Sequence, residues 1–269
     1  MKIDTIEQID NNKQPRYSPY RSLEKALDVL RFFSSYSIST VTEISRKLGY
    51  PKSTISGLLK TLSRYELVEK NKDNSFRLGI KAFELGFSYL NGMEMHKVAR
   101  LWAERLLNDE QEPVHVAIRR GTGIYIILDV QPPASYMAIL QTGMNVPAHS
   151  TALGKILIAA MPDDELDVLL KKPLGSFTEY TITDPARLRD ELIRVKQSGY
   201  AIDREESLKG LICISAPVFQ RDGSVIAAVS ISSMELVGNE DKVLALIPKI
   251  KTIANNISRD IGYQPAKSF

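Results

Sequence analysis

The chain has 269 residues, 43% of them hydrophobic and 25% charged, with a formal net charge of +3 and a single cysteine, Cys213. This length favours two small domains over one core, and the balanced composition excludes low-complexity and collagen-like chains. No stretch approaches the roughly 18 consecutive apolar residues of a membrane span. The polar N-terminus lacks the apolar run of a signal peptide, and one cysteine rules out an internal disulfide framework, so we expect a cytoplasmic protein with no membrane partner.

Positive charge is concentrated in the first part of the chain. Residues 1–77 contain 14 Lys and Arg against 9 Asp and Glu, a balance of +5, whereas the remaining residues contain 21 and 23, a balance of −2. A basic first part joined to a near-neutral second part suits a nucleic-acid-binding module attached to another domain.

The first expected domain spans residues 21–78 and follows a flexible arm of residues 1–20. Ser22 is expected to cap its first helix. The apolar residues of this helix repeat on one face and are Leu23, Ala26, Leu27, Leu30 and Phe33. A second helix, in "VTEISRKL", ends at Gly49, and Pro51 is expected in the first turn of a third helix.

The third expected helix separates apolar from polar residues in a way that suits DNA binding. Its inward residues are Ile55, Leu58, Leu59 and Leu62, and its outward residues are Ser53, Thr54, Ser56, Lys60 and Arg64. Two short β-prone runs around a polar turn follow in "LVEKNKDNSFRLG", so three helices precede a hairpin, which is the order of a winged helix-turn-helix.

Short hydroxyls reach base edges and phosphates in the major groove, and basic side chains add phosphate contacts. We expect base and phosphate contacts from Ser53, Thr54, Ser56 and Lys60, and phosphate contacts from Arg46, Lys52, Arg64 and Lys72. The alternative is an ordinary solvated helical hairpin.

Residues 79–92 are expected to form a linker helix. The segment "GIKAFELGFSYL" repeats apolar residues at Ile80, Phe83, Phe87 and Leu90. A short helix this rich in aromatic residues needs a packing partner, so we expect it to join the two domains and to pack in a dimer. The alternative is a helix internal to one domain.

The second expected domain spans residues 93–263 and precedes a tail of residues 264–269. A helix around Trp102 is followed by "VHVAIRR", "IYIILDV", "YMAIL", the loop "VPAHS" and the helix "TALGKILIAAM". Helices at 163–171 and 185–198 precede two strand-like runs joined by "QRDGS", whose Asp-Gly is a hairpin signal, and a long helix from Asn239 to Ile261. Paired antiparallel strands with helices at either end predict an α+β fold.

Three segments of this domain contain residue types found at reactive sites: "VPAHSTALGK", "GYAIDREE" and "GLICISAPVF". His149, Asp203 and Cys213 could form a nucleophilic set, or Ser150 could be the nucleophile. However, the G-x-S-x-G elbow is absent, a thiol in an apolar strand is usually inert, and no local spacing indicates zinc. We predict no catalytic residue, metal ligand or cofactor. The alternatives are a redox or metal sensor acting through Cys213, and an enzyme with an auxiliary DNA-binding domain.

A binding pocket accounts for the same segments. Thr151 and Ala152 stand at a helix start, where free N–H groups and the positive end of the helix dipole suit a carboxylate. Ser230 and Ser232 face the same side of one strand, and Cys213 on a neighbouring strand can line the same cavity. The alternative for each serine is an ordinary satisfied polar group.

Four motifs occur in a specific order and spacing across both domains: "EISRKLGYPKSTISGLLKTL", "VPAHSTALGK", "GYAIDREES" and "GLICISAPVFQRDGSVIAAVSIS". With them, the chain from Ser22 to Ile261 resembles the IclR family of bacterial transcription regulators. The resemblance implies a winged helix-turn-helix, a linker helix and a GAF-like α+β effector-binding domain. It also implies binding to double-stranded operator DNA as a homodimer or dimer of dimers, and control of a catabolic operon by a small organic acid.

The resemblance also implies a small-molecule site. Carried over residue by residue, it comprises Ala152, Leu153, Asp203, Leu211, Cys213, Ser230 and Ser232. Asp203 suits an anionic effector only if it takes a proton or meets a donor group of that effector. An effector bound there would favour one geometry of the dimer or tetramer, and the linker helices would transmit that geometry to the DNA-binding domains.

Overall fold

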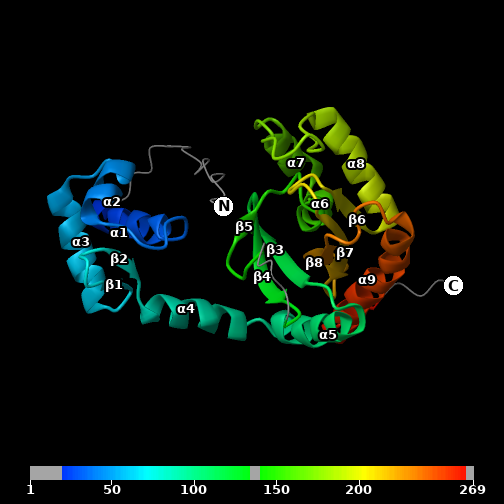
Figure 1. Cartoon of the computed structure of the whole chain (residues 1–269), viewed down its shortest axis with the longest axis horizontal. Coiled ribbons are helices and arrows are strands. Elements are labelled where there is room, and N and C mark those ends of the chain that lie inside the picture. Colours follow the sequence, from blue (N-terminus) through cyan, green and yellow to red (C-terminus); the bar gives the residue numbers. More distant parts are fainter. Residues whose placement is uncertain (1–19, 134–139, 265–269) are drawn as a thin grey trace. The chain divides into compact units, whose positions relative to one another are not determined.

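The computed structural model describes residues 20–133 and 140–264, and the chain divides into two compact units, residues 1–90 and 91–269 (Figure 1). The expected N-terminal arm and C-terminal tail lie outside the described residues, apart from Tyr20 and Gln264. The run "YMAIL" also lies outside them, apart from Leu140.

The first unit is a three-helix bundle with a β-hairpin. Its elements are α1 (Arg21–Phe32), α2 (Val41–Leu48), α3 (Lys52–Arg64), β1 (Val68–Lys70) and β2 (Phe76–Leu78). The two strands pair antiparallel, with Val68 opposite Leu78. One core joins all five elements and buries Val29, Phe32, Phe33, Ile44, Ile55, Leu59, Leu62, Val68 and Phe76. The predicted winged helix-turn-helix is confirmed.

Local signals fix both ends of α2. Thr40 and Glu43 form a capping box in which the Thr40 hydroxyl accepts from the Glu43 N–H, while the Glu43 carboxylate accepts from the Thr40 N–H at 2.7 Å. These hydrogen bonds hold the pKa of Glu43 below its usual value. Gly49 ends the helix with a φ of 72°, a left-handed conformation that glycine adopts without strain.

The turn between α2 and α3 is tied to the rest of the unit. The Ser45 hydroxyl donates to the Tyr50 carbonyl at 2.7 Å, and the Tyr50 hydroxyl donates to the Asp28 carboxylate of α1 at 2.6 Å. The bond to Asp28 raises the pKa of Tyr50 to about 12. Pro51 is the N-cap residue of α3 and not, as expected, part of its first turn.

The structure corrects the expected first helix. Ser22 lies inside α1 and not at its N-cap, and Leu23 and Leu27 are 57% and 50% exposed. The fully buried residues of α1 are Val29 and Phe32, in its C-terminal half. The core is formed with two short helices and a pair of three-residue strands, and these elements cover only the C-terminal half of α1. The periodicity of apolar residues does not show which half is covered.

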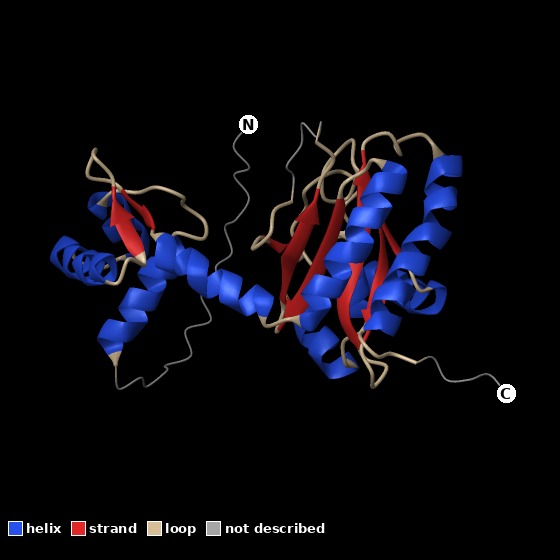
Figure 2. Cartoon of the chain, turned by 90° about the horizontal axis from the view of Figure 1, so that it is seen from below, coloured by secondary structure: helices blue, strands red, loops and turns tan. Residues whose placement is uncertain are grey.

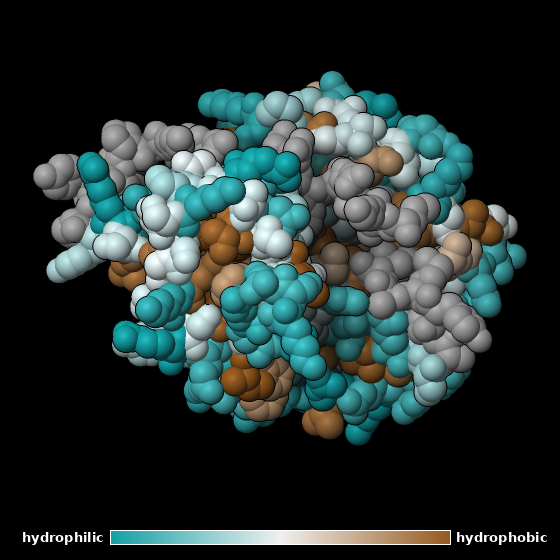
Figure 3. All heavy atoms as spheres, turned by 60° about the vertical axis from the view of Figure 1, so that its left-hand side comes forward, coloured by the Kyte–Doolittle hydropathy of each residue, from teal (hydrophilic) through white to brown (hydrophobic). Residues whose placement is uncertain are grey.

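The helix α4 (Ile80–Asn91) contains the boundary between the two units and has no buried residue. At its start, a Cβ at Gly79 would lie 2.2 Å from the Glu66 carbonyl oxygen, so only glycine fits this approach. Five of its large apolar side chains are at least half exposed and are Ile80, Phe83, Leu85, Phe87 and Tyr89. Figure 3 shows several hydrophobic areas on a mostly hydrophilic surface.

The second unit is built on a six-stranded antiparallel sheet in the order β5-β4-β3-β8-β7-β6. The strands are β3 (Val114–Arg120), β4 (Gly123–Val130), β5 (Asn145–Val146), β6 (Ala201–Arg204), β7 (Ile212–Phe219) and β8 (Val225–Ser233). The helices are α5 (Glu94–Glu110), α6 (Ala152–Ala159), α7 (Asp163–Leu170), α8 (Pro185–Ser198) and α9 (Glu240–Asp260). The predicted α+β class, the "QRDGS" hairpin and the long closing helix are confirmed.

Helices cover both faces of this sheet (Figures 1 and 2). On one face, α5 and α9 pack against each other and against the strands. On the other face, α6 lies across β6, β7, β8 and β3. Its side chains Leu153, Ile156 and Leu157 share a core with Ala117 and Ala228 of the sheet. Among the described helices, none is long and apolar enough to cross a lipid bilayer.

Candidate DNA-binding and ligand-binding sites

The helix α3 presents a polar face to solvent. Ile55, Leu59 and Leu62 are buried, whereas the residues predicted to contact DNA from this helix are exposed, apart from the half-buried Thr54. In the middle of that face, a Cβ added to Gly57 would meet no heavy atom within 4 Å. The centre of this face therefore carries no side chain, and short hydroxyls and basic side chains surround it.

The basic residues of α3 and Lys72 of the hairpin turn are not neutralised by other described residues. Lys52, Lys60, Arg64 and Lys72 are exposed and form no salt bridge with any described residue. Arg77 of β2 differs, since it pairs with Glu69 across the hairpin. Unpaired cations on one surface attract a polyanion without first breaking internal ion pairs.

The strand register brings together most of the predicted effector residues. Cys213 of β7 lies between Asp203 of β6 and Ser232 of β8 as direct cross-strand partners. Ser230 lies two residues from Ser232, so its side chain is on the same face of β8. This face is the one that α6 covers, because Ala228 belongs to the core that contains α6.

The start of α6 lies against these strands. Ala152, Leu211 and Cys213 pack together in one buried cluster. Leu153, also predicted for the site, packs instead into the neighbouring core under α6. The structure therefore places six of the predicted effector residues around the α6 N-terminus and the β6–β7–β8 sheet face, with Leu153 at the margin.

The loop before α6 is held tightly against its first turn. The Thr151 hydroxyl donates to the Pro147 carbonyl at 2.7 Å and accepts from the Gly154 N–H at 3.1 Å. A Cβ at Gly154 would lie 2.3 Å from the Ala148 carbonyl oxygen, so the loop touches the helix where only glycine fits. The first intrahelical bond at this end runs from the Lys155 N–H to the Thr151 carbonyl, and the Thr151 hydroxyl takes the Gly154 N–H, which leaves the amides of Ala152 and Leu153 without an intrahelical partner.

Several buried polar atoms near this helix end have no hydrogen-bond partner among the described residues. They are the hydroxyls of Ser150, Ser230 and Ser232 and both ring nitrogens of His115, a residue of β3. Buried polar groups are normally paired, and an unpaired one costs about 1–3 kcal/mol. Unpaired groups concentrated on one sheet face and in the loop before α6 are typical of a site for a polar ligand or ordered water.

Asp203 is fully buried and is held by its own loop. Its carboxylate accepts from the Glu206 N–H at 2.7 Å, from the Ser207 N–H at 3.3 Å and from the Ser207 hydroxyl. Burial raises the pKa of Asp203 to about 6 despite these donors. A carboxylate has about four acceptor positions, so one remains for a donor group of a ligand.

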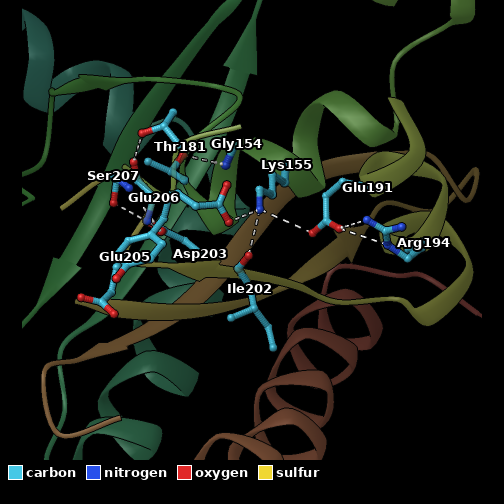
Figure 4. Close-up of polar contacts among 12 residues, drawn as sticks. Gly154, Lys155, Thr181, Glu191, Arg194, Ile202, Asp203, Glu205, Glu206 and Ser207 are labelled. Atoms are coloured by element: carbon cyan, nitrogen blue, oxygen red, sulfur yellow. Dashed lines mark hydrogen bonds and ion pairs between the residues drawn. The ribbon is translucent and has the colours of Figure 1, made fainter. Parts of the chain in front are cut away.

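Among the described residues, Lys155 has the largest fully buried side chain, and no local sequence pattern indicates its burial. Its ammonium donates to Glu206, to the Ile202 carbonyl at 3.0 Å and to Glu191 at 3.4 Å (Figure 4). Burial nevertheless raises the pKa of Glu206. The network ties α6 to the loop that holds Asp203, so the helix end and this side of the site are mechanically joined.

The structure does not support an activated pair of Cys213 and His149. Burial raises the pKa of the Cys213 thiol, and the Asp203 carboxylate adds to the effect, so a reactive thiolate is disfavoured. Burial lowers the pKa of His149, whose Nε2–H donates to the Gly175 carbonyl at 2.8 Å. Among the described residues, no group of three or more His, Cys, Asp or Glu side chains is arranged to hold a metal ion.

A separate hollow of about 740 Å³ lies between α8 and the edge strand β6. None of the seven predicted effector residues lines it. Of its charged side chains, Glu191 pairs with Arg194 and Arg204 pairs with Glu240, whereas Glu206 pairs with Lys155 through one oxygen and keeps the other, Oε2, without a partner among the described residues. Volume alone therefore does not identify the ligand site, and the unpaired polar groups point to the sheet face under α6.

A winged helix-turn-helix with an unpaired basic face, joined in one chain to an α+β unit with a polar site, is the architecture of a ligand-responsive transcriptional regulator. Family models agree with this class. The IclR helix-turn-helix domain matches residues 22–72, and the C-terminal domain of the bacterial transcriptional regulator IclR matches residues 87–259. The chain belongs to the IclR family: it is a DNA-binding transcriptional regulator with a C-terminal ligand-binding domain.

Individual relatives match over nearly the whole chain. The transcriptional repressor AllR of Klebsiella pneumoniae is 32% identical over 248 residues, which are 91% of each chain. The crystal structure of Thermotoga maritima IclR is 31% identical with a TM-score of 0.71, covering 90% of this chain and 99% of that one. An IclR homologue from Microbacterium hydrocarbonoxydans, solved in complex with 4-hydroxybenzoate, shares the fold with 22% identity and a TM-score of 0.77, covering 89% and 98%.

Proposed function

We propose that this chain binds operator DNA as a homodimer or dimer of dimers and controls a catabolic operon in response to a small organic acid. Residues 21–78 would bind the DNA, residues 79–92 would link and pair the protomers, and residues 93–263 would bind the acid. The observation that carries the proposal is the set of unpaired buried polar groups at the N-terminus of α6, in a chain whose other unit is a DNA-binding fold.

The DNA contacts would come from the exposed face of α3 and from the wing. Ser53, Thr54 and Ser56 carry short hydroxyls that suit base edges, and Lys60 lies one turn further along the same helix. The phosphate contacts would come from Arg46, Lys52, Arg64 and Lys72, which are exposed basic residues of α2, α3 and the hairpin turn.

A carboxylate is the best match for the α6 N-terminus. Outward-pointing amides and the positive end of the helix dipole favour an anion, and the hydroxyls of Ser230 and Ser232 are further donors. Asp203, with its raised pKa, can meet an acidic ligand as a neutral group or accept from its hydroxyl. A homologue of the same fold binds 4-hydroxybenzoate, which is such an acid.

Dimer formation is supported by α4. Five apolar side chains of this 12-residue helix are at least half exposed, and Phe83 stacks on Phe87 with ring centroids 5.7 Å apart. Apolar side chains at this density on one helix are usually covered by a partner. Because α4 adjoins both units, a second copy packed on it would let a change in one unit alter the spacing of two DNA-binding units.

The proposed protein acts in the cytoplasm by binding and not by catalysis. An effector changes operator affinity only by its preference for one state, with coupling of about 1–3 kcal/mol. The buried Cys213 thiol and the hydrogen-bonded His149 ring give no support to the Cys213–His149 set that the enzyme alternative would use.

Fluorescence anisotropy with DNA from upstream of the chain's own gene tests this proposal. The full chain is titrated at two salt concentrations, with and without a panel of small carboxylic acids. We expect binding tighter than to random DNA, and a shift in affinity with one acid. Specific binding that no acid changes would refute the organic-acid effector, and no preference over random DNA would count against an operator in that fragment.

A further inference from the structure

Four polar side chains form a row across the sheet beneath α6. Ser215, Ser230, His115 and Asp129 are direct cross-strand partners on β7, β8, β3 and β4. Residues directly opposite each other point to the same face of an antiparallel sheet. Ser230 belongs to the proposed ligand site, whereas His115 and Asp129 lie beyond it and have no role in the function described so far.

His115 is an unusual buried residue. It is only 2% exposed, it lies between Val114 and Val116 on a buried strand, and neither of its ring nitrogens has a hydrogen-bond partner among the described residues. A buried imidazole normally pairs at least one nitrogen. The charged group beside it is the Asp129 carboxylate, whose Oδ1 lies 3.4 Å from Nε2 of His115.

Asp129 orients this ring through an ion-pair contact at Nε2 that misses good hydrogen-bond geometry, so Nδ1 is the nitrogen left without any contact of this kind among the described residues. The Gln131 amide donates to both Asp129 oxygens, at 3.0 and 3.1 Å. Burial opposes ionisation of Asp129, but the adjacent His115 ring and the Gln131 amide hold its pKa below the usual value. A carboxylate beside Nε2 favours the tautomer with a proton on Nε2. In that tautomer, Nδ1 is a hydrogen-bond acceptor.

Ser230 supplies the complementary donor. Its hydroxyl has no partner among the described residues, and its cross-strand position puts its Cβ about 5 Å from that of His115. An acceptor nitrogen and a donor hydroxyl on paired residues fit a ligand hydroxyl, which would donate to Nδ1 and accept from Ser230. A second carboxylate suits this place less well, because Asp129 and Asp203 already put two carboxyl groups on the same face.

We propose that the ligand site extends along β8 to β3, and that His115 and Ser230 select an acid with a hydroxyl at its far end. This inference rests on the proposed acid site at the α6 N-terminus. The rows of Ser232 and Ser230 are two residues apart, or about 7 Å along the strand. The selected hydroxyl therefore lies about 7 Å from the carboxylate, as it does in an extended six-carbon ω-hydroxy acid.

Isothermal titration calorimetry with the full chain tests the proposal, using 6-hydroxyhexanoate, hexanoate and adipate. We expect the wild type to bind 6-hydroxyhexanoate about tenfold more tightly than hexanoate, in keeping with one or two buried hydrogen bonds. His115→Phe removes both nitrogens and is expected to abolish the preference while still binding hexanoate. His115→Asn keeps a polar atom near the position of Nδ1 and is expected to restore part of it.

A matched control is available in the same row. Ser215 already donates to the Val229 carbonyl at 2.9 Å, so Ser215→Ala is expected to leave the preference unchanged. Circular dichroism and operator binding check that each variant is folded.

The outcomes separate this inference from the acid site on which it rests. If the wild type binds hexanoate and 6-hydroxyhexanoate equally well, and Ser232→Ala binds neither, the acid site is kept and the role of His115 is overturned. A preference that survives in His115→Phe, or tighter binding of adipate, would also overturn it. No binding of any of the three acids would overturn both.

Discussion

The two units of this regulator differ in where most of their unpaired polar groups lie: at the surface in one and in the interior in the other. In the winged helix-turn-helix, apart from the buried hydroxyl of Ser63, the unpaired groups are exposed cations such as Lys60 and Arg64, which take no part in the core. In the α+β unit, they are buried hydroxyls and an imidazole, including Ser230, Ser232 and His115. An unpaired exposed charge costs almost nothing in water, whereas an unpaired buried group costs stability until a ligand pairs it.

This difference separates stability from function in the first unit and couples them in the second. Variants on the exposed face of α3 should change DNA affinity with little effect on unfolding. Variants around α6 should change both, because the same buried network holds the helix and shapes the site.

The largest expected effect follows the loss of Lys155. Lys155→Met leaves Glu206 buried without its cation, and breaking a buried ion pair costs about 3–5 kcal/mol. Urea unfolding of the full chain, followed by circular dichroism, measures this loss. Arg194→Ala is the matched control, because Arg194 pairs with Glu191 of the same network but is largely exposed, so its removal is expected to cost under about 1 kcal/mol. Equal losses in both variants would contradict the comparison.

A smaller effect depends on pH and on Asp203. Its folded pKa, about 6, lies above its usual value of 3.8. The folded state therefore holds this proton more tightly than the unfolded state, so the burial penalty is fully present above about pH 6 and disappears as the pH falls towards about 4. Asp203→Asn cannot ionise, and we expect it to stabilise the protein at about pH 7.5 by on the order of 2 kcal/mol relative to its effect at about pH 4.5.

Urea unfolding of both proteins at the two pH values measures this difference. The side-chain amide introduced by this substitution keeps an oxygen for the backbone N–H groups of Glu206 and Ser207, so the loop is retained in the variant. The same stability difference at both pH values would show that Asp203 has an ordinary pKa.

On the DNA side, Lys60→Ala is expected to weaken operator and unrelated DNA alike. Loss of one phosphate contact corresponds to about a five- to tenfold loss at about 0.1 M salt and lowers the salt slope by about one. Anisotropy titrations over a range of salt concentrations measure both. Lys81→Ala is the control, since Lys81 is already paired with Glu84 on α4. Unchanged affinity and slope for Lys60→Ala would remove this residue from the interface.

The smallest expected effect sharpens the comparison by moving stability and binding in opposite directions. Gly57 has open space around it, so Gly57→Ala removes the flexibility cost of a mid-helix glycine and is expected to stabilise the protein by about 0.5–1 kcal/mol. The added methyl group also projects from the polar face of α3, so operator affinity is expected to fall. A variant that is more stable and binds operator as well as the wild type would show that Gly57 does not face the DNA.

Much of the fold follows from local signals in the sequence. The inward face of α3, the hairpins and the bounds of α7 to α9 were predictable, because periodicity, Asp-Gly turns and glycine caps act within a few residues. The buried face of α1 was not, because the choice between Leu27 and Val29 is made by partners distant in the sequence. The same applies to Lys155, whose burial depends on Glu191 and Glu206.

The candidate ligand site was predictable only in part. Alternation along β8 indicates that Ser230 and Ser232 share a face, but the pairing of Ser230 with His115 is a matter of strand order. The one signal in the sequence was a histidine between two valines in a strand of buried apolar residues. Such a signal identifies an anomaly and not a partner, since register is fixed by the whole sheet.

The most direct test of the account asks whether acid binding under α6 controls DNA binding. Labelled operator bound to the full chain is titrated with the acid identified in the panel, for the wild type and for Ser230→Ala/Ser232→Ala. The account predicts a change in operator affinity of at least about fivefold in the wild type. The double variant should bind operator equally well without acid and should not respond to it. An acid response of the same size in the double variant would contradict the account.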